Sequence, residues 1–212
     1  MDIVEKAIGY VEEFFSREYS GHDYFHTLRV FHTATRLARQ EQADLLTVQL
    51  AALLHDVDDR KLSPETWQGK ENARQFLTEN RVDPARTERI LEILGEVSYA
   101  GEDSVVPTSL EGKCVQDADR LDAIGAIGIA RAFAYGGSHN RFLHHPGIPA
   151  KRHMTKEEYF SSNSTRVNHF YEKLLLLKDK MNTPAARAMA QERHGYMEEY
   201  LARFLAEWDG EA

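Results

Sequence analysis

Two side chains that can bind a divalent metal ion stand next to each other in this sequence. His55 and Asp56 directly follow the apolar run 50–54, so they lie where a buried helix is expected to end. An imidazole and a carboxylate are both ligands of divalent cations, and a bound cation can promote hydrolysis. Taken alone, the pair can also be a helix-ending aspartate beside a core histidine. The metal site therefore needs ligands from other segments.

Two further segments each place a candidate ligand on the inner face of a predicted helix. His26 shares a helical face with the apolar residues four, eight and eleven positions later, which indicates that its imidazole points into a core. Asp119 lies in an apolar helix predicted over 115–127, in line with alanines four, seven and eleven positions later. A carboxylate on a buried face is costly without a cation or a hydrogen-bonding partner. Three helices are therefore expected to bring ligands to one site.

These residues resemble a known ligand pattern. His26, the pair His55 and Asp56, and Asp119 match in order the H…HD…D pattern of the HD-domain metal-dependent phosphohydrolase superfamily, in which the four side chains hold the metal. The chain is more similar still to the small stand-alone bacterial branch of that superfamily. The resemblance rests on the segments 26–30, 53–59, 111–125 and 168–175. It implies an all-α fold, an HD-domain helical bundle with a C-terminal helical extension, and these four residues as metal ligands.

The ligand set that the resemblance implies suits a single divalent ion. Two neutral imidazoles and two carboxylates leave the complex near neutral, and a six-coordinate ion keeps two positions for water and a phosphoryl oxygen. The ion would acidify its water, polarise the phosphorus and orient an in-line attack. Two-metal members of the superfamily have extra histidines between the HD pair and the last aspartate, but residues 57–118 contain none. We therefore expect one ion, with Mn, Mg, Co, Ni, Fe and Zn as candidates.

The resemblance also implies an acidic residue that assists the reaction. Asp59 lies four residues after His55, where related phosphohydrolases have an acid that serves the attacking water or the leaving group. We assign Asp59 as the general acid or base. Asp58 is adjacent, and the sequence leaves open which of the two faces the site. The alternative is that Asp59 only caps the turn or lies in solvent on its surface.

Positive charge for binding a phosphorylated substrate must come from individual residues, because the formal net charge is −8. We expect Arg29, three residues after His26, to contact the substrate. His169 and Lys173 are one helical turn apart in a segment that carries the resemblance, and we expect both to line the pocket. Each of these can instead be an ordinary surface or ion-pairing residue. His22 either contacts a phosphate or caps a helix.

Composition limits the classes of function. No block of Lys and Arg accompanies the negative net charge, which argues against nucleic acid as a partner. The single cysteine, Cys114, excludes a disulfide framework within the chain and is expected to be a small buried hydrophobe. The sequence has neither a signal-peptide pattern nor an apolar run that could span a membrane, so we expect no membrane partner and a cytoplasmic location. The oligomeric state stays open.

The rest of the pattern is helical and is expected to form one domain over 1–212. We expect a metal-binding core at about 20–135, a loop at 136–154 and C-terminal helices at 155–209. Capping residues predict where helices begin: Asp44, Ser63 for a helix over 64–79, Asp83 for a helix over 84–98, Thr155, and Thr183 for a last helix that stops near Gly210. The loop is rich in Gly, Pro and His, and it is either a lid over the site or a solvated insertion.

These inferences together predict a divalent-metal-dependent phosphohydrolase. Its substrate is expected to be a small phosphorylated metabolite, with a nucleotide as the first candidate. Release of phosphate from a monophosphate and of pyrophosphate from a triphosphate both remain open. The alternative from another class is a metal-containing nucleotide sensor or scaffold with vestigial hydrolase activity. The intact ligand set and Asp59 favour the enzyme, because a pure binder has no need of an acid or base beside the metal.

Overall fold

The computed structural model describes residues 2–16, 23–60, 62–97, 105–151 and 164–212. Within these ranges the chain forms helices, turns and irregular segments, and no strand occurs in them. The predicted all-α class is therefore confirmed. Across the same ranges, every helix is too short or too polar to cross a lipid bilayer. The chain divides into two compact units, Met1–Asp119 and Arg120–Ala212, and the predicted single domain over 1–212 stays a prediction.

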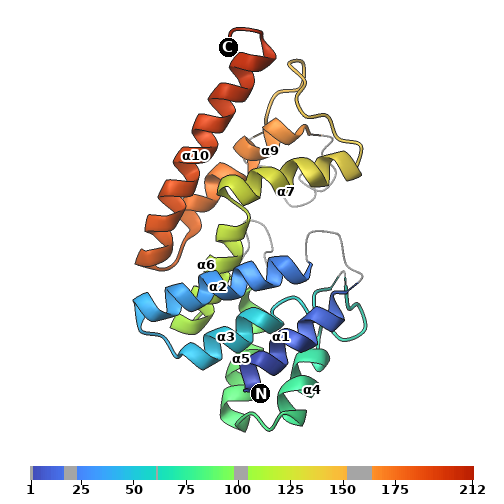
Figure 1. Ribbon diagram of the computed structural model, residues 1–212, viewed down its shortest axis with the longest axis vertical. Helices are drawn as coiled ribbons and strands as arrows, with labels where there is room; N and C mark the ends of the chain where they lie inside the picture. The colour runs from blue at the N-terminus through green and yellow to red at the C-terminus, as the bar shows by residue number, and fades with distance from the viewer. Residues whose placement is uncertain (1, 17–22, 61, 98–104, 152–163) are drawn as a thin grey trace. The chain divides into compact units, whose positions relative to one another are not determined.

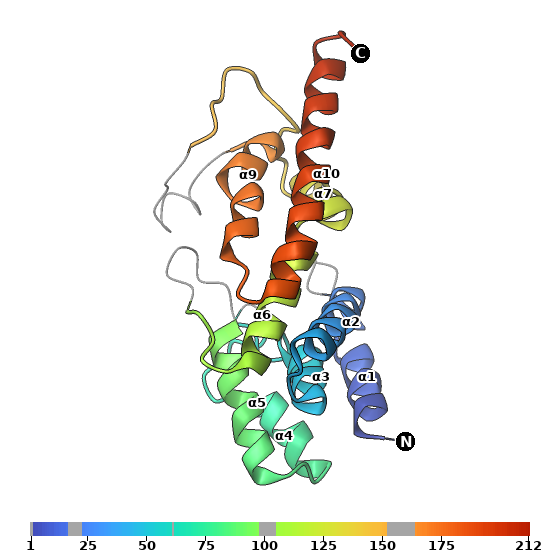
Figure 2. The same cartoon turned by 90° about the vertical axis from the view of Figure 1, so that its left-hand side faces the viewer.

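A buried helix lies at the centre of the first unit. This unit contains α1 (Ile3–Phe14), α2 (Tyr24–Glu41), α3 (Leu45–Leu54), α4 (Glu71–Glu79), α5 (Pro84–Val97) and most of α6 (Leu110–Asp122) (Figure 1; Figure 2). Helix α3 contacts α1, α2 and α5, and residues 50–54 are fully buried. Because α3 is apolar on all sides, it must be surrounded by other helices. Its C-terminal end, which leads into the HD pair, is therefore deep in this unit.

Side-chain caps fix where several helices begin. Asp44 accepts a hydrogen bond of 2.8 Å from the backbone N–H of the third residue of α3, as predicted. Thr183 caps α10 (Pro184–Trp208) in the same way at 3.3 Å, also as predicted. Asp23 begins α2 by accepting a hydrogen bond of 2.7 Å from the backbone N–H of His26. Each such cap typically stabilises a helix by about 1 kcal/mol.

The helix predicted over 64–79 is shorter than expected. Helix α4 begins only at Glu71, and residues 64–70 form turns. Ser63 was expected to cap this helix, but its hydroxyl donates to the carbonyl of Val57 at 2.9 Å. Lys70 has a φ of 51°, which separates the turns from the helix. The helix predicted over 84–98 is present as α5, and residue 98 lies outside the described residues.

The helix predicted over 115–127 is in fact two helices. Helix α6 ends at Asp122, and α7 (Gly125–Ser138) begins after a two-residue turn. Gly125 has a φ of 74°, a conformation that glycine adopts without strain and other residues rarely do. Ala126 and Ala130 are consequently exposed, so the predicted alignment of Asp119 with buried alanines is wrong beyond the end of α6.

Two arginines bind the C-terminal end of α6 in the second unit. Arg193 on α10 donates to the carbonyl of Leu121. Arg131 on α7 donates to the side chain of Asp122 at 2.5 Å and to its backbone carbonyl at 3.4 Å. The last carbonyls of an α-helix have no partner within the helix, so these guanidinium groups act as its C-terminal cap. Asp122 is thus part of a structural ion pair.

The second unit is organised around α10. It also contains α7, α9 (Arg166–Glu172) and the 3-10 helix η2 (Leu174–Lys180), and α10 contacts both α7 and η2. Met197 and Leu201, which were predicted to lie in the core, are buried, whereas Trp208 at the end of the same stripe is exposed. The α10 helix ends at Trp208, close to the predicted stop near Gly210.

The predicted loop begins later than expected. Helix α7 continues through both glycines to Ser138. Gly136 lies against the side chain of Arg166, where a Cβ atom would collide. Residues 139–151 then run without regular structure. The rest of the loop and the helix predicted to begin at Thr155 lie partly or wholly outside the described residues.

Candidate metal centre

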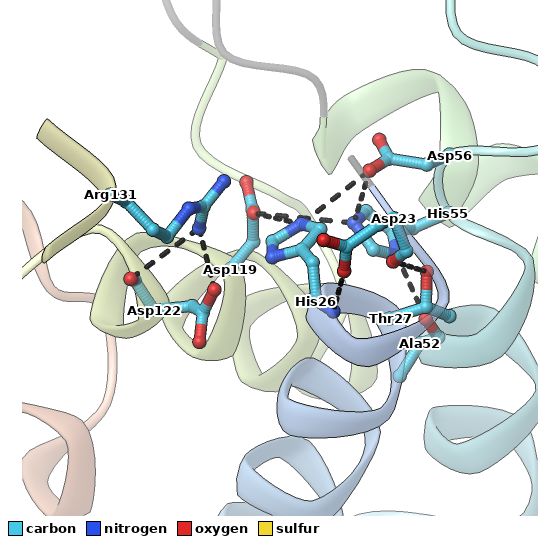
Figure 3. A network of polar contacts seen from close by, with 9 residues as sticks. All are labelled: Asp23, His26, Thr27, Ala52, His55, Asp56, Asp119, Asp122 and Arg131. Atoms are coloured by element: carbon cyan, nitrogen blue, oxygen red, sulfur yellow. Dashed lines mark hydrogen bonds and ion pairs between the residues drawn. The ribbon is translucent and has the colours of Figure 1, made fainter. Parts of the chain in front are cut away.

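Four side chains of the first unit converge at the ends of three helices (Figure 3). His26 lies in the first turn of α2, His55 and Asp56 directly follow α3, and Asp119 lies in the last turn of α6. The three-residue connection 42–44 folds α2 and α3 into a helical hairpin. The start of α2 therefore lies beside the end of α3.

The ligand atoms are close enough to share one ion. The Nε2 atom of His26 lies 3.5 Å from Asp56 Oδ2 and 3.4 Å from Asp119 Oδ1. The Nε2 atom of His55 lies 3.1 Å from Asp56 Oδ2 and 4.0 Å from Asp119 Oδ1. In His26, His55 and Asp56, one ligand atom from each residue lies within 4.8 Å of the others. These three residues can hold a metal ion, and Asp119 approaches the same space through one carboxylate oxygen.

The chemistry of His55 fits a metal ligand. Its Nδ1 atom lies 2.8 Å from the carbonyl oxygen of Ala52, which can only accept a hydrogen bond, so the proton resides on Nδ1 and the lone pair on Nε2 is available. That Nε2 atom is buried, and none of the described residues hydrogen bonds to it. A buried nitrogen lone pair that faces two carboxylates is energetically costly unless a positively charged group lies between them. A divalent cation is such a group, and the donor set suits one.

The charged neighbours in the site shift the pKa values of His55 and Asp119. Burial by itself lowers the pKa of His55, but Asp56 and Asp119 oppose it, and the net effect is a pKa above its usual range. Burial likewise raises the pKa of Asp119, but a hydrogen bond with His26 and the charge of His55 reverse this, so the pKa lies below its usual range. Both shifts in pKa therefore come from neighbours of opposite charge. The two carboxylates bring a negative potential into a largely buried site.

The two aspartates after the HD pair have different surroundings. Asp58 is 2% exposed, and its carboxylate accepts hydrogen bonds from the backbone N–H groups of Asn72 and Ala73 at 3.2 and 3.0 Å. Asp59 is half-buried in the turn that follows the HD pair, and its N–H donates to the carbonyl of Asp56 at 3.0 Å. Asp58 is thus engaged by the N-terminus of α4. The role of Asp59 as acid or base stays a prediction.

The predicted substrate-binding residues lie in both units. Arg29 is half-buried on α2 in the first unit. His169 on α9 and Lys173 at its C-terminal end are half-buried in the second unit. His22 lies outside the described residues. Whether Arg29, His169 and Lys173 contact a substrate stays a prediction.

His169 differs from what its residue type suggested. Burial, together with the positive charges of Arg166 and Lys173, lowers its pKa to about 3. It is therefore a neutral hydrogen-bonding group, not a cation. Arg166 was not among the residues predicted from the sequence, yet its guanidinium is buried and lies 5.4 Å from the centre of the Tyr135 ring. The only sequence signal for it was Gly136, which gives its side chain room.

Cys114 behaves as predicted. It is fully buried in α6, and burial, reinforced by nearby acidic groups, raises the pKa of its thiol to about 12. A thiol with such a pKa is a poor nucleophile at neutral pH. Cys114 is therefore a core residue and takes no part in the chemistry of the site.

Comparisons with known proteins agree with this geometry. A family model described as HD domain matches residues 23–124. The chain is 37% identical over 199 residues to the protein YpgQ of Bacillus subtilis, covering 93% of this chain and 89% of that protein. It is also similar to the crystal structure of an HD-superfamily hydrolase from Bacillus thuringiensis, with a TM-score of 0.79, 40% identity and coverage of 98% and 97% of the two chains. The structure of Bacillus subtilis YpgQ in complex with ADP gives a TM-score of 0.78 at 33% identity, covering 99% of this chain and 100% of that chain.

Two histidines of α2 offer a matched test of the metal centre. His26 faces the cluster, whereas His32 lies on the same helix and is exposed. We expect His26→Ala to weaken binding of a divalent ion by at least about 100-fold, since even the outer partners of metal ligands contribute 10–100-fold. His32→Ala should bind the ion as the wild type does. Isothermal titration of the apo-protein with Mn²⁺ measures both, and equal affinities in the two variants would refute the site.

The low pKa of His169 predicts a dependence of stability on pH. The unfolded chain binds a proton at His169 below its ordinary pKa of 6.5, whereas the folded chain does so only near 3. The contribution to folding stability is therefore complete above pH 6.5 and is lost as the pH falls toward 3. Between pH 7 and pH 5 the loss should reach about 2 kcal/mol, from roughly 1.4 kcal/mol per pH unit.

The glutamine variant isolates this effect. His169→Gln keeps a polar side chain but has no proton to bind in this range, so its free energy of unfolding should fall less between pH 7 and pH 5 than that of the wild type. Urea denaturation at pH 7 and pH 5 gives the change in the free energy of unfolding for the wild type and for the variant. Equal differences in the wild type and the variant would show that folding does not lower the pKa of His169.

Proposed function

The chain belongs to the HD domain family, and from this premise we propose that it is a divalent-metal-dependent phosphohydrolase that acts on a small phosphorylated metabolite. The observation that carries the proposal is the convergence of His26, His55 and Asp56 on one point, with the Nε2 atom of His55 buried and facing a carboxylate. A nucleotide is the first candidate substrate. It is supported by the relative YpgQ, whose structure was solved in complex with ADP.

The four converging side chains would hold a single ion. His26, His55, Asp56 and Asp119 supply two imidazoles and two carboxylates from the ends of three helices. Each imidazole would bind through Nε2, the atom nearest the carboxylates. When bound, a divalent ion supplies a Lewis acid that polarises a phosphoryl group and favours ionisation of water. Mn, Mg, Co, Ni, Fe and Zn remain candidates.

The remaining roles are assigned to individual residues that the sequence singled out. Asp59, in the turn directly after the HD pair, would accept a proton from the attacking water or deliver one to the leaving group. Arg29 and Lys173 would contribute positive charge toward the phosphates. His169, being neutral, would contribute a hydrogen bond instead. Whether phosphate or pyrophosphate is released follows from which phosphorus these groups hold at the metal.

A turnover assay tests the proposal directly. The apo-protein is supplied in turn with Mn²⁺, Mg²⁺, Co²⁺ and Ni²⁺ and offered nucleoside mono-, di- and triphosphates, and the products are separated by ion-exchange chromatography. We expect hydrolysis that depends on the ion and is absent in His26→Ala, because that variant lacks a ligand. Binding of nucleotides without turnover under every ion would instead support a sensor.

Asp59→Asn tests the assignment of the acid or base. The amide keeps the shape of the side chain but cannot exchange the proton, so kcat should fall by on the order of 10²–10⁴ while the metal content stays that of the wild type. Asp58→Asn should mainly lower the melting temperature, since Asp58 binds the N-terminus of α4. A fully active Asp59→Asn variant would show that proton transfer occurs elsewhere.

A further inference from the structure

The chain leaves helical geometry at the HD pair. Helix α3 ends at Leu54, and residues 55–58 form a turn. The N–H of Val57 donates to Leu54 at 3.3 Å, and that of Asp59 to Asp56 at 3.0 Å. These short-range bonds form single turns rather than a continuing helix. The carbonyl of Asp59 also accepts the N–H groups of Leu62 at 3.1 Å and Ser63 at 2.8 Å. Apart from these local bonds, the position of Asp59 depends on contacts that the turn makes with other segments.

Asp58 makes the first of these contacts. Its buried carboxylate accepts the backbone N–H groups of Asn72 at 3.2 Å and of Ala73 at 3.0 Å, in the first turn of α4. The residue at the N-cap position of that helix, Lys70, makes no side-chain capping bond. The first N–H groups of a helix have no partner within it, and the helix dipole favours a negative charge there. Asp58 thus caps α4 from a segment 14 residues earlier in the chain.

Asn72 returns the contact. Its Nδ2 atom donates to the carbonyl of Val57 at 3.0 Å and to Thr66 Oγ1 at 2.9 Å. The same carbonyl accepts the hydroxyl of Ser63 at 2.9 Å. The Val57 carbonyl and the Asp58 side chain are therefore both held by groups outside the turn. We refer to the reciprocal contacts of Asp58 and Asn72 as the clamp.

We propose that Asp58 and Asn72 are positioning residues that hold Asp59 in place beside the metal ligands, an inference that rests on the proposed role of Asp59. The clamp adjoins Asp59 in the chain, with Asp58 bonded to α4 and the preceding carbonyl bonded to Asn72. The two candidate histidine ligands are fixed by other means: His55 through its hydrogen bond to Ala52, and His26 through the first turn of α2. Loosening the clamp should therefore displace Asp59 and leave His26 and His55 in place.

Asn72→Ala is the primary test. It removes both side-chain bonds of Asn72 but keeps the backbone N–H that binds Asp58. We expect kcat to fall at least about 10-fold, because small displacements of a reacting group are costly, while KM and the affinity for Mn²⁺ change by less than about 2-fold. Ser63→Ala removes the other donor to the same carbonyl and should lower kcat in the same way. It is the second variant if Asn72→Ala does not fold.

Asp83→Ala is the matched control for lost stability. Asp83 accepts the backbone N–H of Arg86 at 3.0 Å at the start of α5, so its removal also costs a helix cap but leaves the HD turn untouched. We expect Asp83→Ala to lower the melting temperature and to keep the wild-type kcat. If Asn72→Ala shows the same result, with a lower melting temperature and normal kcat, the clamp is only structural and the proposal is overturned.

The double variant shows whether Asn72 acts through Asp59. In the Asp59→Asn variant the proposed acid or base is already absent, so displacing the turn should not lower kcat further. The double variant Asn72→Ala with Asp59→Asn should therefore have the same kcat as Asp59→Asn alone. Independent, multiplying effects would overturn the proposal while leaving the role of Asp59 intact. If Asp59→Asn is fully active by itself, the assignment of Asp59 fails and the clamp proposal fails with it. These outcomes separate the two inferences.

Discussion

The structure of the first unit depends on the cost of placing charged and polar groups in an apolar interior. Two imidazoles and two carboxylates lie where three helices begin or end, at the fully buried C-terminal end of α3. Such groups are costly to bury unless each meets a partner of opposite charge or a hydrogen bond. The present arrangement meets this condition through the close approach of His26 and His55 to Asp56 and Asp119. A divalent ion in their midst would satisfy it more fully.

The need of buried polar groups for a partner also explains which features could be predicted from the sequence. His26, His55 and Asp119 stand out because each is polar on an apolar helical pattern, and the caps at Asp44 and Thr183 follow from local chemistry alone. Features that depend on contacts between distant segments could not be predicted. The bonds of Asp58 reach 14 and 15 residues along the chain, so the sequence did not separate it from its neighbour. The break between α6 and α7 likewise depends on the backbone of Gly125 and on the side chain of Arg193 packed against it.

Burial also decides which side chains carry charge. By residue type, His169 was a candidate for binding an anion through charge, but burial beside Arg166 and Lys173 keeps it neutral. Arg166 was overlooked because an arginine in a polar segment resembles any surface residue, yet it is buried in the second unit. Sequence reasoning estimates charge from composition, whereas the folded chain determines it from solvation and neighbours. Substrate recognition in this protein must therefore be considered from the environment of each cation, not from the net charge of the chain.

Helix α6 makes the two compact units difficult to separate by dissection. The boundary falls between Asp119 and Arg120, inside a continuous helix. A fragment that stops at this boundary would leave Asp119 as the terminal residue of a frayed helix, although it would contain every candidate ligand. Beyond it, the last carbonyls of α6 depend on Arg131 of α7 and Arg193 of α10. A truncated protein or a recombined homologue should therefore keep the chain through α10, because Arg131 and Arg193 bind the last residues of the helix that carries the candidate ligand Asp119.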